Sequence, residues 1–170
     1  SDVYKRQVVN KVNQKSIAIQ DTYGQRFQHC WGCGTKNEEG LHLKSYPSED
    51  GETVICKIVP DYKYTGGVPA NLFGGMIATI FDCHGTASAA YFAHKEKGLE
   101  LTEDTTIGRF ITARIEVDFK MPVPMDTEVT VRARPLEITK RKVNLDMEME
   151  ADGKVRAKAR MVAVAVKDDM

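Results

Sequence analysis

Hydrophobic and polar residues follow two patterns along this chain, one typical of β-strands and one typical of a buried helix. Residues 41–46 and 53–59 alternate between apolar and polar side chains, so each segment predicts a strand. Residues 74–98 form a mostly apolar segment that is interrupted by polar residues such as Asp82 and His84 and ends at Gly98. This segment predicts a single helix of about 20 residues that is apolar on most of its circumference and therefore buried.

The chain after residue 107 has the period of strands throughout. Four strands are predicted there, at residues 110–120, 128–138, 142–150 and 155–166. In the first of them, Ile111 and Ala113 fall on the predicted core face and Thr112 falls on the opposite face. Asp152-Gly153 predicts a hairpin turn between the last two strands.

The element order is two strands, one buried helix and four strands joined by short turns. A helix of about 21 residues spans roughly 32 Å, and a strand of about 11 residues spans roughly 36 Å. One sheet can therefore cover the whole helix. The sequence predicts an α+β fold in which a long antiparallel sheet wraps around one central helix.

The 170-residue length suits one domain with a short arm. Residues 1–28 are polar and weakly patterned, and we interpret them as an N-terminal arm with a short helical turn. Residues 29–170 form the predicted domain. Residues 1–7 match nothing that follows and carry no predicted function.

Charge and cysteine content narrow the functional classes. The 24 basic residues balance 24 acidic ones, so no basic excess indicates nucleic-acid binding. No run approaches the roughly 20 apolar residues that span a bilayer. A chain of this size can stabilise itself by burial, so its four cysteines need not form disulfides. Reduced thiols and a cytoplasmic location are the resulting predictions.

Three motifs together resemble the hotdog-fold acyl-CoA thioesterase superfamily, and most closely its phenylacetate-pathway group. They are Cys30-Trp31-Gly32-Cys33-Gly34 with Asn37, Gly40 and Leu41; Phe73-Gly74-Gly75 running to Asp82; and the strand from Thr112 to Pro122. The resemblance covers roughly the last 140 residues and includes the element order. It implies a hotdog fold, an acyl-CoA substrate, no cofactor, and a homodimer or tetramer with its sites at the subunit interface.

Asp82 is the most informative polar residue, because apolar residues and Cys83 surround it on the predicted helix. An ionised carboxylate buried in protein costs several kcal/mol unless it is paired or hydrogen-bonded. The resemblance implies that Asp82 is the base or nucleophile of thioester hydrolysis. The alternative is a satisfied polar group at a subunit contact, hydrogen-bonded to Thr79 or Thr86 one turn away.

Gly74 and Gly75 stand at the predicted start of this helix, where backbone N–H groups lack intrahelical acceptors and the helix end carries partial positive charge. This geometry suits the oxyanion that forms when a thioester carbonyl is attacked. The alternative is an ordinary glycine-rich junction between a loop and a helix. Phe73 occupies the position where the family usually has His, and its side chain cannot donate a hydrogen bond.

The remaining candidates follow from the resemblance. Thr112 matches a family residue that orients water or the catalytic acid and comes from the partner chain, although threonine is also common in strands. Asn71 can bind substrate or water, or act simply as a turn residue. Lys120 matches a position where the family places cations near the CoA phosphates, although an exposed lysine is usually just solvated.

Cys30 and Cys33 form a Cys-x-x-Cys pair. His29 and His42 can complete a set of four zinc ligands, but the spacing matches no standard zinc finger, so we predict no metal site. A redox pair lacks the βαβ context that such motifs have. His84 is two positions after Asp82 and therefore faces away from it on a helix.

Three functions remain open from the sequence. Thioester hydrolysis leads, with Gly74, Gly75 and Asp82 from one subunit and Thr112 from another. A non-catalytic acyl-CoA-binding or sensing protein on the same fold is the alternative that Phe73 favours. A hotdog dehydratase is the third, and that chemistry usually requires a histidine base beside the acid. The length and chemical class of the acyl group are not readable from the sequence.

Overall fold

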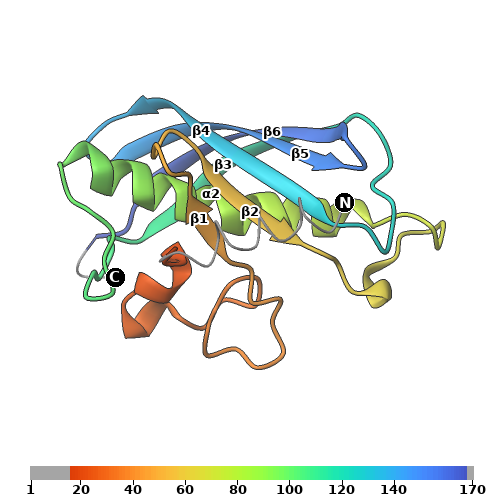
Figure 1. The fold of residues 1–170 in the computed structure, drawn as a ribbon, viewed down its shortest axis with the longest axis horizontal. Helices are drawn as coiled ribbons and strands as arrows, with labels where there is room; N and C mark the ends of the chain where they lie inside the picture. Colours follow the sequence, from red (N-terminus) through yellow and green to blue (C-terminus); the bar gives the residue numbers. More distant parts are fainter. Residues whose placement is uncertain (1–15, 168–170) are drawn as a thin grey trace.

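A six-stranded antiparallel sheet wraps around one long α-helix in the computed structural model, which describes residues 16–167 (Figure 1). The helix is α2 (Gly74–Glu96). The strands are β1 (Ser45–Pro47), β2 (Val54–Ile58), β3 (Phe110–Phe119), β4 (Val129–Ile138), β5 (Lys142–Ala151) and β6 (Lys154–Ala165). This architecture is the predicted hotdog fold.

The strands lie in the order β1-β2-β4-β5-β6-β3, so β1 and β3 form the two edges of the sheet. Strands β4, β5 and β6 are consecutive hairpins. Asp152 and Gly153 both have positive φ, at 51° and 71°, as a two-residue turn of type I′ requires. The predicted hairpin turn is therefore confirmed.

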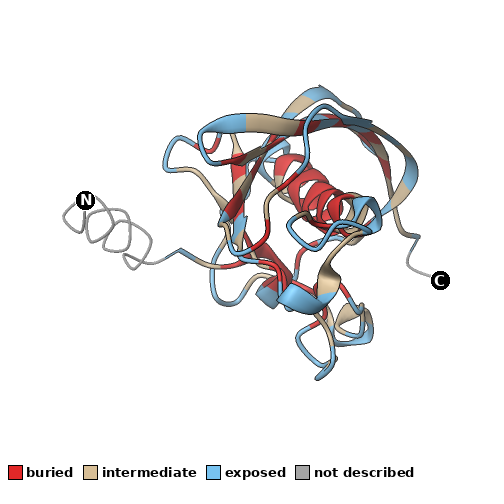
Figure 2. Ribbon diagram, turned by 90° about the vertical axis from the view of Figure 1, so that its right-hand side faces the viewer, coloured by how far each residue is buried: buried red, intermediate tan, exposed pale blue. Residues whose placement is uncertain are grey.

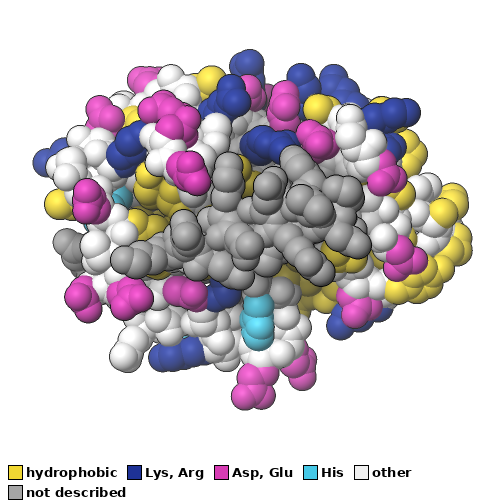
Figure 3. All heavy atoms as spheres, viewed as in Figure 1, with side chains coloured by type: hydrophobic (Ala, Val, Ile, Leu, Met, Phe, Trp, Pro, Cys, Tyr) yellow, Lys and Arg dark blue, Asp and Glu magenta, His cyan; other side chains and the backbone are white. Residues whose placement is uncertain are grey.

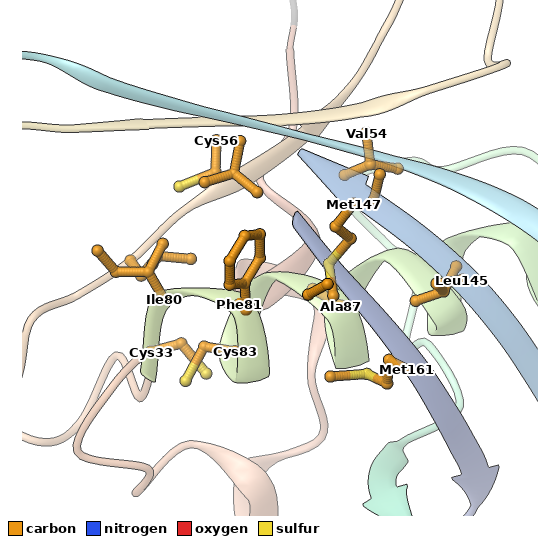
Figure 4. Packing of buried hydrophobic residues seen from close by; sticks show 14 of the residues in the cluster. Cys33, Val54, Cys56, Ile80, Phe81, Cys83, Ala87, Leu145, Met147 and Met161 are labelled. Carbon is orange, nitrogen blue, oxygen red and sulfur yellow. The ribbon is translucent and has the colours of Figure 1, made fainter. Parts of the chain in front are cut away.

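Helix α2 is buried between the sheet and the loops, as its composition predicts. Figure 2 shows the helix enclosed by the curved sheet, and Ile80 and Phe81 are fully buried. A Cβ atom on Gly85 would lie 2.5 Å from Met161 Cε, so the helix approaches β6 closely at this glycine. Met147 from β5 and Met161 from β6 lie along the helix in Figure 4. Fully buried apolar side chains of this size each contribute roughly 1.5–3 kcal/mol to folding.

The first predicted strand, at residues 41–46, is wrong in its position, because only Ser45–Pro47 pair with β2. The preceding backbone turns instead toward the glycine-rich loop. His42 has a positive φ of 51°, which is incompatible with a continuous strand. The N–H groups of Leu41 and Leu43 donate to the carbonyls of Trp31 and Gly32.

Part of the predicted arm packs against the domain. Two short 3₁₀ turns, η1 (Ile19–Thr22) and η2 (Gln25–Phe27), precede the glycine-rich loop. Ile19 and Tyr23 belong to the hydrophobic core. Residues 1–15, including the first seven, lie outside the described residues, so that part of the prediction stays untested. The domain boundary at residue 28 also stays a prediction.

A β-bulge in β3 changes which of its residues face the helix. Thr112 pairs with Ala163 and Arg114 pairs with Val162, so Ala113 is an extra residue. Thr112 therefore shares the inner face with Phe110, and Ile115 resumes that face after the bulge. The predicted placement of Ile111 and Ala113 on the core face is wrong, since both are exposed. One inserted residue reverses the alternation that the sequence pattern assumes.

Candidate active site

Asp82 and Thr112 form the central pair of the candidate site. The Thr112 hydroxyl donates a hydrogen bond of 2.5 Å to the Asp82 carboxylate. Asp82 lies on helix α2. Thr112 lies on β3 just before the bulge, where its side chain faces the helix. Thr112 thus reaches Asp82 within one chain, and the prediction that a partner chain contributes this threonine to Asp82 is wrong. The bulge is the physical reason, because it points Thr112 toward its own helix.

Asp82 itself is half-buried rather than fully buried, although its neighbours Phe81 and Cys83 are buried. The two threonines considered as alternative partners bond elsewhere. Thr79 donates to the carbonyl of Gly75 at 2.8 Å, and Thr86 donates to the backbone carbonyl of Asp82 at 3.2 Å. The carboxylate therefore keeps lone pairs for a water molecule or substrate on its open side.

Gly74 and Gly75 begin α2 as predicted, and both are exposed. Met76 and Ile77 donate their N–H groups to the carbonyl of Phe73, whereas Gly74 and Gly75 come earlier, where a helix offers no acceptor. Phe73 is the N-cap residue and its side chain makes no capping hydrogen bond. Two backbone donors at a positive helix end are thus available to an oxyanion.

Aromatic rings frame this helix start. A Cβ atom on Gly75 would lie 2.5 Å from the Phe73 ring, and one on Gly74 would lie 3.4 Å from the Phe119 ring. Both rings are exposed, at 40% for Phe73 and 57% for Phe119. Glycine at position 75 therefore lets Phe73 fold over the helix start. Strand β3 ends at Phe119, so this ring stays at the surface beside the helix start.

A groove of about 500 Å³ opens beside the helix start. It brings together four predicted site residues: Asn71, Phe73, Gly74 and Lys120. The backbone of Asn71 is fixed by hydrogen bonds with Gly66 and Val68. Within residues 16–167 its side-chain amide has no hydrogen-bond partner, so it can bind a ligand in the groove. Lys120 brings a cation to the same groove.

Asp82 does not line this groove. Eight residues separate it from Gly74, a rise of about 12 Å along the helix at 1.5 Å per residue. Its side chain leans toward the helix N-terminus, which shortens the gap by only a few ångström. A carbonyl held by the Gly74 N–H group therefore cannot touch the Asp82 carboxylate of the same chain directly.

His84 faces away from Asp82, as predicted, and is part of a buried hydrogen-bond network. Its ring nitrogens lie 2.8 Å from Ser45 Oγ and 3.0 Å from the carbonyl of Val54. Gln20 completes the network by bonding Ser45. Burial lowers the pKa of His84 to about 4, so the imidazole is neutral at pH 7. A dehydratase requires a histidine base beside the acid. His84 does not fill this role.

The family model described as "Thioesterase superfamily" matches residues 70–158. A thioesterase superfamily protein from Shewanella loihica PV-4 is 30% identical, with a TM-score of 0.62, and the match covers 84% of this chain and 97% of that one. A comparison with curated proteins finds no match.

Two further solved structures share the fold at lower identity. PaaI from the phenylacetic acid degradation operon of Escherichia coli is 13% identical with a TM-score of 0.56, covering 68% of this chain and 74% of PaaI. A Streptococcus mutans protein bound to acetyl-CoA is 13% identical with a TM-score of 0.55, covering 68% of this chain and 82% of its own.

The sheet wrapped around a single helix defines this protein as a hotdog-fold protein. The chain belongs to the thioesterase superfamily. Membership supports thioester hydrolysis as its general activity. Within the described residues, no helix has the length and apolar character needed to cross a membrane. The cytoplasmic location stays a prediction.

Proposed function

We propose that this protein hydrolyses acyl-CoA or a similar thioester to the free acid and thiol. The observation that carries the proposal is the hydrogen bond between Thr112 and Asp82 on the open part of α2. A half-buried carboxylate oriented by a hydroxyl group is suited to accept a proton from water. Family membership supports the same reaction.

Asp82 acts as a general base in this proposal. Thr112 holds one carboxylate oxygen, and the other takes a proton from a water molecule that attacks the thioester carbon. A C–O bond forms, the carbonyl electrons move to the oxygen, and the N–H groups of Gly74 and Gly75 bind that oxyanion. Its collapse breaks the C–S bond, and the thiolate takes up the proton from Asp82. Direct attack of Asp82 on the thioester carbon is the alternative form of the same reaction.

The complete site is proposed to form between two copies of the chain. Strand β3 is a ten-residue edge that pairs with β6 on one side only, and such an edge favours pairing with another chain. The first half of α2 carries an open stripe of Gly75, Ala78, Thr79 and Asp82.

A two-fold axis near Ala78 would set two such helices antiparallel. Gly74 and Asp82 are each four residues from Ala78, so Gly74 of one copy would lie opposite Asp82 of the other. This arrangement removes the gap of about 12 Å within one chain. It also revises the predicted division of the site: Asp82 and Thr112 come from one subunit, and the glycines come from the other. Whether dimers pair further into a tetramer is not addressed by this contact.

The groove at the helix start is proposed to bind the substrate. Asn71 and Phe73 would contact the thioester end, and Lys120 would bind a CoA phosphate. Hydrophobic side chains also gather at this end of the molecule, over the loop between β2 and α2 (Figure 3). Exposed Val59, Tyr62 and Val68 belong to that loop. An apolar surface beside a cation matches a ligand that has an acyl chain and a phosphate.

Acyl-CoA binding without hydrolysis is the second candidate, and Phe73 at the N-cap favours it. The Phe73 side chain makes no capping bond and covers Gly75, so it contributes no polar group to catalysis. A panel of acyl-CoAs separates the two candidates. Release of free thiol above the spontaneous rate supports hydrolysis, whereas saturable binding of the same compounds without thiol release supports a binding protein. Addition of water to an enoyl-CoA would instead indicate a dehydratase.

A further inference from the structure

Three cysteine sulfurs meet beside the catalytic helix. Cys30 and Cys33 come from the glycine-rich loop, and Cys83 comes from α2, directly after Asp82. All three Sγ atoms lie within 4.8 Å of one another, and those of Cys30 and Cys83 are 3.8 Å apart. Figure 4 shows Cys33 and Cys83 side by side under the helix, with Cys56 on the opposite side.

Glycines shape the loop so that the sulfurs can converge. A Cβ atom on Gly32 would lie 2.3 Å from the Cys83 sulfur, so only glycine lets the loop come this close. A Cβ atom on Gly34 would lie 2.5 Å from the backbone nitrogen of Cys30. Gly34 also donates its N–H group to the carbonyl of Cys30 at 2.7 Å, which closes a tight turn around the Cys-x-x-Cys pair.

Three converging cysteine sulfurs are a donor set that soft metals prefer. Cysteine coordinates zinc as the thiolate, so a cation bound here would displace the thiol protons. Thiolate ligands also favour zinc over hard cations such as magnesium.

We propose that Cys30, Cys33 and Cys83 form a zinc site. Sulfur ligands 2.3 Å from a tetrahedral zinc ion lie about 3.8 Å apart, which is the distance between Cys30 and Cys83. Cys33 and Cys83 are buried, while Cys30 is partly exposed and leaves one side of the cluster open to solvent. Within residues 16–167 no fourth cysteine, histidine or carboxylate joins the group, so a water molecule would complete the coordination of a bound zinc ion.

The two histidines that the sequence offers as possible further ligands lie elsewhere. His42 Nε2 contacts the carbonyl of Asn37, and His29 is exposed. The actual third sulfur is 53 residues away from Cys30 in sequence, so the local spacing of the pair could not reveal it. Arg109 lies near Cys33, and its guanidinium group stands 4.7 Å from the centre of the Tyr23 ring. Its positive charge would offset the net negative charge of zinc bound to three thiolates.

Zinc bound here would fix the glycine-rich loop to α2 next to Asp82. Coordination replaces thiol protons, so zinc binding should release protons and strengthen as the pH rises. Neither consequence depends on thioesterase activity. A failed zinc titration therefore leaves the proposed hydrolysis untouched, and an inactive enzyme leaves the metal site untouched.

The test is a zinc titration of the full chain, fully reduced and freed of metal, against a chromophoric chelator of known zinc affinity. Cobalt(II) serves as a spectroscopic substitute, and magnesium serves as a hard-cation control. Cys30→Ser removes the partly exposed ligand with little effect on the core. Cys56→Ala is the matched control, because Cys56 is also buried and reduced but lies outside the cluster.

We expect one zinc per chain in the wild type and in Cys56→Ala. Loss of a residue that only hydrogen-bonds a metal ligand lowers metal affinity roughly 10–100-fold. Cys30→Ser removes a ligand itself, so its zinc affinity should fall by more than that. Cobalt should give the intense absorption of a tetrahedral thiolate complex, with proton release in unbuffered solution. Equal affinity in Cys30→Ser and Cys56→Ala, or no stoichiometric zinc in the reduced wild type, would overturn the site. A Cys30–Cys33 disulfide in metal-free protein purified without reductant would also overturn it, in favour of a redox pair.

Discussion

The hydroxyl group of Thr112 donates a hydrogen bond of 2.5 Å to the carboxylate of Asp82, although 30 residues separate them in the chain. The bond exists because Ala113 is bulged out of β3, which turns Thr112 toward α2. It fixes one oxygen of the acid and leaves the other for water. The proposed chemistry depends on this orientation more than on burial, since Asp82 is only half-buried.

Removal of the hydroxyl should slow hydrolysis without unfolding the protein. Thr112→Val keeps the shape of the side chain but loses the bond to a charged group, an interaction of about 1.5–3 kcal/mol. We expect kcat to fall roughly 10–100-fold, while Thr112→Ser retains most of the activity. Steady-state thiol release from the best substrate measures both. An equal fall of kcat in Thr112→Val and Thr112→Ser would show that the hydroxyl group does not act on Asp82.

Removal of one backbone donor should test the oxyanion site. Gly74 is the first residue of α2, a position that tolerates proline. Gly74→Pro deletes its N–H group, and kcat should fall about 10²–10³-fold, as for loss of one oxyanion donor. Gly74→Ala keeps the N–H group and adds only a Cβ atom at 3.4 Å from the Phe119 ring. Similar kcat values for the two variants would place the oxyanion elsewhere.

Two inactive variants should restore each other if the site lies between subunits. Asp82→Asn and Gly74→Pro are refolded together, so that mixed dimers form. One site of each mixed dimer then has an intact Asp82 and an intact Gly74 from different copies. With random pairing and two sites per dimer, about a quarter of all sites should be active. No recovery despite mixed dimers, detected with two affinity tags, would place both groups of a site in one chain.

Acid should destabilise the fold through His84. The pKa of this buried imidazole is lowered from its ordinary value of 6.5 to about 4, so the unfolded state binds one proton more within that window. Stability is therefore complete above pH 6.5 and is lost as the pH falls toward 4, by about 3 kcal/mol.

Urea unfolding at several pH values measures this loss. His84→Gln retains a neutral donor and acceptor for Val54 and Ser45, so its stability should change less over the same window. His94→Gln is the matched control, because His94 lies in the last turn of the same helix and, among the described residues, its ring bonds only to the carbonyl of Glu100. The assignment of this pH dependence to His84 would be contradicted by one result. In that result, His84→Gln loses stability in acid as the wild type does, whereas His94→Gln does not.

The long helix and strands with a regular hydrophobic pattern could be predicted from the sequence. Helix α2 and strands β4, β5 and β6 match their predicted ranges closely, because each has many residues that repeat the same pattern. Gly74, Gly75 and Asp82 lie on the helix as expected, and Asn71, Phe73 and Lys120 share a groove with Gly74.

Other features depend on single residues that a pattern does not reveal. The bulge at Ala113 reversed the predicted direction of Thr112, and the positive φ of His42 shortened the first strand. The approach of Cys83 to the Cys-x-x-Cys pair depends on a close passage at Gly32, which only the folded chain shows. Local spacing predicts elements well and predicts contacts between distant segments poorly.

The most direct test of the account is the kcat of Asp82→Asn on the acyl-CoA that the wild type hydrolyses fastest, measured together with the affinity for that compound. Asp104→Asn is the matched control, because Asp104 lies in an exposed turn. We predict that Asp82→Asn lowers kcat about 10²–10⁴-fold, as for loss of a general base, while affinity and the Asp104→Asn rate stay at the wild-type level. Hydrolysis by Asp82→Asn at the wild-type rate would contradict the account.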